Sequence, residues 1–219
     1  PTMPILDAVR SFLRGLNSYL AQGATRTAAS APQDAAAFLD ELFGRYPFTP
    51  HAQEWLRNNV RLQIVDLNDP SGGGNWHPDQ QLVRLQGVQH EAAIHELAHA
   101  MWSQLRQDRH RRDRFVAAVH QLAGDDDPRW ERAHTLARHY VHGIPTQPGF
   151  EHGMLLPPDQ WGIGGGPQGR WNDAEMYAGL ASGCMADIRR LPPYVRHFYT
   201  DLFQELSPDT PSPALHILT

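Results

Sequence analysis

Apolar residues recur at intervals of three and four through most of the chain, and this spacing places them on one face of a helix. Phe38, Leu39, Leu42 and Phe43 form one such face. Thr49-Pro50 predicts a helix start, because threonine caps a helix N-terminus and proline fits the first turn. Helices are predicted over residues 5–19, around 38–43, and over 50–60, 112–122, 128–141 and 172–190, with a last one from residue 192.

Two short segments follow a different pattern. Residues 61–67 alternate in polarity and contain β-branched side chains, which predicts a strand. Residues 81–85 predict a second strand, followed by a helix from near residue 87 to about 105. The loops are expected in the small, polar or glycine- and proline-rich segments 21–33, 68–74 and 146–171. The pattern therefore predicts an α+β fold, mainly helical, with a small sheet beside helix 87–105.

The chain length of 219 residues fits one main domain. We expect an N-terminal helical segment over residues 1–50, the main domain over 51–206 and a loose tail over 207–219. No stretch approaches the roughly 20 continuous apolar residues of a membrane span, and no signal peptide is visible. The chain begins at Pro1, which fits either a removed leader or a trimmed terminus.

The charge and cysteine content exclude several kinds of partner and site. A net charge of -5 provides no basic field for nucleic acid. The lone Cys184 excludes an internal disulfide framework and a multi-cysteine zinc module. We therefore expect no nucleic-acid partner. We also expect no membrane span and a monomer.

The central part of helix 87–105 carries the run His95-Glu96-Leu97-Ala98-His99. Residues four apart lie on the same helical face, so His95 and His99 can direct two imidazole nitrogens at one zinc ion. Glu96 lies close enough to take a proton from a water on the metal without being a ligand. The flanking residues are small or apolar, and burying these polar side chains without a partner would be costly. The run therefore predicts one catalytic Zn2+ ion, with Glu96 as the general base.

A catalytic zinc usually has three protein ligands, and the third is predicted from a later helix. Glu175, 76 positions after His99 (175 − 99), is the best candidate, because Ala178, Gly179 and Ser182 leave its helix face nearly bare. The same glutamate could instead form a capping box with Asn172. The fallback ligands are Asp173, His134, His139 and His152.

These residues resemble the gluzincin branch of the zincin metallopeptidases. His95, Glu96 and His99 match the HExxH motif in full, and Glu175 with Ala178 matches the helix that supplies the third ligand. In toxin-like members an acidic residue directly follows the alanine that Ala178 matches, and it orients a zinc-bound histidine. This chain has Gly179 there, so that contact must come from another residue. The resemblance implies a zincin-like fold and a zinc metalloendopeptidase that hydrolyses peptide bonds.

The resemblance also implies a substrate groove beside an edge strand, to which a peptide or protein substrate adds as a further strand. Residues 81–85 occupy that position, so Leu82, Val83 and Arg84, with Trp76 at the mouth, are the expected substrate contacts. Trp76 could equally pack the loop. The family also uses a donor to the developing oxyanion, for which Tyr140 and His152 are both candidates. Two other functions stay open: a zinc-site protein that binds peptides or a partner with little turnover, and a regulatory protease with one protein target.

Overall fold

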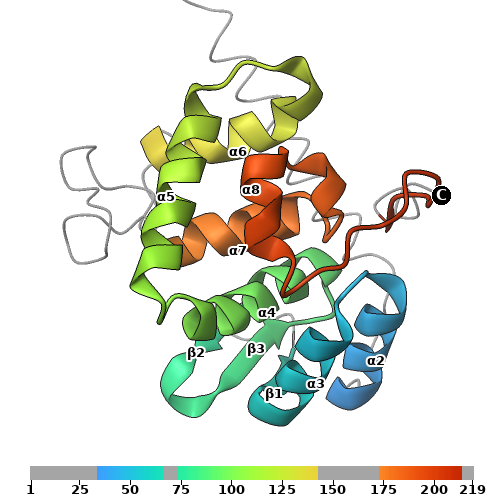
Figure 1. The fold of residues 1–219 in the computed structure, drawn as a ribbon. Coiled ribbons are helices and arrows are strands. Elements are labelled where there is room, and N and C mark those ends of the chain that lie inside the picture. The colour runs from blue at the N-terminus through green and yellow to red at the C-terminus, as the bar shows by residue number, and fades with distance from the viewer. Residues whose placement is uncertain (1–33, 67–73, 143–172, 214–219) are drawn as a thin grey trace, which may run out of the picture. The chain divides into compact units, whose positions relative to one another are not determined.

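The computed structural model describes residues 34–66, 74–142 and 173–213, apart from the side chains of residues 139 and 142. Figure 1 shows a mainly helical chain with a small sheet, which confirms that part of the prediction. The sheet has three strands, of which the sequence predicts two. The predicted helix over residues 5–19 and the loops over 21–33 and 146–171 lie outside the described residues. The elements are α2 (Ala35–Arg45), α3 (Pro50–Asn59), β1 (Arg61–Val65), β2 (Asn75–His77), β3 (Leu82–Gln86), α4 (His90–Leu105), α5 (Arg109–Gly124), α6 (Glu131–His142), α7 (Asp173–Gly183) and α8 (Pro193–Arg196).

The first two described helices form for the local reasons that the sequence indicates. The side chain of Asp34 accepts a hydrogen bond from the Ala36 amide at the start of α2. Thr49 does the same for Ala52 at the start of α3, where Pro50 occupies the first turn. The apolar face predicted around residues 38–43 is buried. Thus α2 belongs to the same compact unit as the later described helices and strands, although the sequence places a boundary at residue 50.

The sheet has the strand order β1-β3-β2, which differs from the expected arrangement. β3 pairs in parallel with β1 and antiparallel with β2, so Leu82, Val83 and Arg84 have a paired strand on both sides. The prediction that this strand is the sheet edge is therefore wrong. Val83 is also fully buried in the core, where its side chain cannot contact a substrate. Among the described residues, β2 is the edge strand on this side of the sheet.

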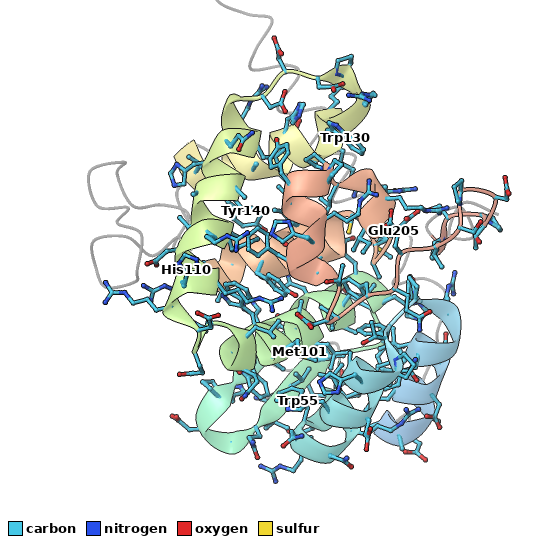
Figure 2. All side chains as sticks on the ribbon, viewed as in Figure 1. Trp55, Met101, His110, Trp130, Tyr140 and Glu205 are labelled. Atoms are coloured by element: carbon cyan, nitrogen blue, oxygen red, sulfur yellow. The ribbon has the colours of Figure 1, made fainter. Side chains whose placement is uncertain are left out.

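The helix α4 lies between the sheet and α7, as Figure 1 shows. Its buried side chains include Ile94 and Leu97, and Met101, labelled in Figure 2, lies further along the same helix. Trp102 stacks on Tyr177 of α7 with ring centroids 4.4 Å apart. This close packing of two distant segments brings the predicted third-ligand helix onto the motif helix.

The helix α7 is shorter than the predicted helix over residues 172–190. It ends at Gly183, after which Met185 and Ala186 adopt positive φ angles of 51° and 62°. The Ala186 amide bonds back to the Ala181 carbonyl, which closes the helix end. Two consecutive non-glycine residues are left-handed here, which is uncommon, and the helical pattern did not predict this end.

The remaining helices follow the predicted order with shifted ends. α5 begins at Arg109, where Asp108 caps two backbone amides, and α6 follows a 3-10 turn at Pro128–Trp130. The last predicted helix is limited to α8 and the 3-10 turn His197–Tyr199, while Phe203 pairs in a β-bridge with Phe48. No helix among the described residues has the length and apolarity that a bilayer crossing requires.

Candidate metal centre

Two histidines of α4 meet at the site. His95 and His99 lie one helical turn apart, with ring centroids separated by 4.7 Å. Their Nε2 atoms are 3.0 Å apart, so both nitrogens face the same point. The helix holds them there because its opposite side is anchored by apolar core residues, among them Ile94 and Leu97.

Glu175 reaches the same point from α7. Its Oε2 atom lies 3.5 Å from His95 Nε2, and its Oε1 atom lies 3.3 Å from His99 Nε2. One donor atom from each of the three residues lies within 4.8 Å of the other two. The structure therefore brings together the two histidines and the glutamate that the sequence selects.

The spacing of these donors fits a zinc ion. Bonds of about 2.0–2.1 Å in a tetrahedral site place any two ligand atoms roughly 3.3 Å apart. The two Nε2 atoms are 3.0 Å apart, and the nearest Glu175 oxygen of each, Oε2 for His95 and Oε1 for His99, lies at 3.5 and 3.3 Å, close to that value. The Glu175 side chain keeps 40% of its exposure, against 23% for His95 and 11% for His99, so the cluster opens to solvent on the carboxylate side. An open position is what distinguishes a catalytic zinc site from a structural one.

The two glutamates of the site have opposite pKa shifts. Burial opposes ionisation of Glu175, but hydrogen bonds from His95 and His99 outweigh it and hold its pKa well below the usual range. Burial raises the pKa of Glu96 to about 7, against the lowering effect of His95 and of a hydrogen bond from the Trp76 amide. Glu175 is therefore a carboxylate suited to a metal, while Glu96 can exchange a proton near neutral pH.

The edge strand β2 lies against Glu96. The Trp76 amide donates to its carboxylate, and a Cβ on Gly74 would approach Glu96 Cγ to 2.9 Å. The Trp76 side chain is partly buried and packs against the core. Trp76 thus contributes to the site through its backbone, and the absence of a side chain at Gly74 leaves room for the glutamate.

Asp173 is not a ligand but holds α7 against the end of α4. Its carboxylate is buried and accepts hydrogen bonds from Trp102 Nε1 at 2.7 Å and from Arg106 at 3.1 Å. The other fallback ligand with a described side chain, His134, is buried on α6 and is not part of the cluster. His152 and the side chain of His139 lie outside the described residues.

We expect Asp173→Ala to lower the free energy of unfolding by about 2–3 kcal/mol, because it leaves the indole and the guanidinium without their buried partner. Urea denaturation of the metal-free protein measures this change. The matched control is Asp113→Ala, which removes an exposed partner of Arg112 and should change stability by less than about 0.5 kcal/mol. Equal effects of the two substitutions would contradict the anchoring role.

Two contacts were not identified from the sequence. Ser182 Oγ lies 3.4 Å from His95 Nδ1. Tyr140 of α6 packs on Gly179, where a Cβ would overlap its hydroxyl, and Figure 2 shows this tyrosine inside the helical part of the molecule. Burial raises the pKa of Tyr140, and the nearby charge of Glu175 raises it further. The only sequence signal for either contact was Gly179 on the nearly bare face of α7.

Comparisons of the chain with protein-family models, with curated proteins and with solved structures found no match.

Proposed function

We propose that this chain is a zinc-dependent peptidase in which His95, His99 and Glu175 hold the metal and Glu96 is the general base. The observation that carries the proposal is that the two histidine Nε2 atoms lie 3.0 Å apart and each lies within 3.5 Å of a carboxylate oxygen of Glu175, next to a buried glutamate. When bound, zinc would supply a water of lowered pKa and polarise the carbonyl of the scissile peptide bond.

The role of Glu96 follows from its surroundings. It is buried, and the Trp76 amide fixes its carboxylate on the side of the edge strand. A base must be ionised to accept a proton and must hold that proton until the leaving amine needs it, which requires a pKa near the working pH. A pKa of about 7 meets both conditions at neutral pH.

The substrate groove is proposed along β2 rather than β3. The Trp76 amide donates to Glu96, and β2 is the edge strand beside β3 among the described residues. An extended peptide that adds to β2 would lie beside Glu96, using backbone hydrogen bonds that are independent of side-chain identity. The proposed substrate is therefore an extended segment of a peptide or protein.

A zinc site that binds a peptide with little turnover is the second candidate. Gly179 favours this second function, because no acidic side chain supports a zinc-bound histidine from that position. Turnover of a generic peptide library separates the two functions. Cleavage of a single cellular protein without generic turnover would instead indicate a regulatory protease.

We expect the purified protein to hold about one zinc per chain, and His95→Ala or His99→Ala to lose it, because each substitution removes one of three ligands. Elemental analysis measures the metal, and peptide hydrolysis should stop on chelation and return with added zinc. His110→Ala is the control, since this exposed histidine lies on α5, as Figure 2 shows. Full zinc content in both cluster variants would rule out the site.

A further inference from the structure

The side chain at position 179 is excluded by the packing of α6 on α7. Gly179 lies four residues after Glu175, and so on the same helical face. Any side chain there would overlap the hydroxyl and ring of Tyr140, which is itself buried. The structure therefore prevents an acidic residue from supporting a histidine from this position.

Ser182, three residues further along α7, is buried and contacts His95 instead. Its Oγ lies 3.4 Å from His95 Nδ1 and 3.3 Å from the Gly179 carbonyl oxygen. A serine hydroxyl has one proton to donate and lone pairs that accept. Because a carbonyl oxygen can only accept, the Ser182 proton goes to Gly179, and the contact with His95 requires the imidazole to donate.

We propose that Ser182 is a positioning residue that fixes His95 as the Nδ1–H tautomer and directs the lone pair of Nε2 at the metal. The proposal rests on the zinc site proposed above. A hydrogen-bond partner on the other ring nitrogen orients a histidine ligand and raises its basicity. Serine is neutral, however, so it orients the ring without adding the negative charge that a carboxylate would bring. His95 is therefore a weaker donor here than a histidine supported by an acid.

The test compares two serines that make the same local bond. Ser182 donates to the carbonyl three residues earlier, and Ser103 on α4 does the same to Ala100 at 2.6 Å. Only Ser182 also contacts a histidine of the cluster. Ser182→Ala and Ser103→Ala thus remove the same kind of helix contact, and their difference isolates the contact with His95.

Zinc affinity is measured by competition with a chromophoric chelator. Ser182→Ala should weaken zinc binding by about 10-fold, toward the lower end of the roughly 10–100-fold range for residues that hydrogen-bond a metal ligand, while Ser103→Ala stays at the wild-type value. In the zinc-loaded protein, proton NMR should show a slowly exchanging His95 Nδ1–H signal, and this proton should exchange faster in Ser182→Ala. A purely structural role of Ser182 would not change that exchange rate selectively.

The outcomes separate this inference from the proposed function. If the wild-type protein binds zinc, and Ser182→Ala has the same zinc affinity and the same His95 Nδ1–H exchange rate, the role of Ser182 is overturned and the metal site stands. Equal losses in the two serine variants would also overturn it, since they would reflect the helix contact alone. A wild-type protein that binds no zinc would overturn the metal site, and the role of Ser182 with it.

Discussion

Glu96→Gln is expected to retain one zinc per chain and to lose peptide hydrolysis by about 10²- to 10⁴-fold, the contribution of a positioned general base. Glutamine keeps the size of the side chain and can still accept the hydrogen bond from Trp76, but it cannot take a proton. Steady-state hydrolysis of a peptide library, with metal content measured on the same samples, checks the result. Glu91→Gln, an exposed substitution in the first turn of the same helix, is the control.

The stability of Glu96→Gln distinguishes a lost base from a damaged fold. Burial raises the pKa of Glu96 from 4.5 to about 7, so the folded metal-free protein becomes less stable as pH rises from 4.5 to 7 and the unfolded chain releases its proton first. Neutral glutamine avoids this cost. At pH 8 the metal-free variant should be more stable than wild type by up to about 3 kcal/mol, and at pH 4 the two should be nearly equal. Unchanged hydrolysis in the variant would exclude Glu96 as the base.

Glu175→Gln is expected to weaken zinc binding by orders of magnitude, because a neutral amide replaces the only anionic ligand of the cluster. Metal-free stability should change by no more than about 1 kcal/mol, since the side chain is partly exposed. The capping-box interpretation instead predicts an unchanged zinc affinity, with only a cap contact affected. Titration of zinc against a chelator, with denaturation of the metal-free protein, separates the two.

The structure offers a matched control for this substitution. Glu41 pairs with His90 Nε2 at 3.1 Å and has a side-chain exposure of 46%, close to the 40% of Glu175. Glu41→Gln thus breaks a glutamate–histidine pair of similar exposure away from the cluster. It should leave zinc affinity at the wild-type value. Wild-type affinity in Glu175→Gln as well would remove Glu175 from the ligand set.

Local signals in the sequence were sufficient for most helices and for the residues of the cluster. Thr49-Pro50 marks a helix start through capping chemistry that acts within a few residues, and the structure confirms it. The spacing of His95 and His99 on one helix is likewise a local property. The bare face of α7 indicated which later glutamate could approach them, and the structure places Glu175 there.

Features that depend on contacts between segments far apart in the sequence could not be predicted from local signals. β2 has only three residues, and its pairing with β3 converts the expected edge strand into the central one. The end of α7 at Gly183 was not predicted, because the non-glycine residues Met185 and Ala186 adopt left-handed conformations there. The contact of Ser182 with His95 joins residues 87 positions apart (182 − 95) and required the packed helices.

The burial of α7 has a consequence for the order in which the chain is completed during synthesis. Every residue from Met176 to Gly183 is buried, so this helix is an internal element that α4 needs in order to cover its own face. At typical rates of roughly 5–20 residues per second, a ribosome takes about 4–15 seconds to pass from His99 to Glu175. During that time α4 has no partner on this side. An unfinished chain therefore has two histidines without the carboxylate, and the cluster becomes complete only once the interior of the protein can close.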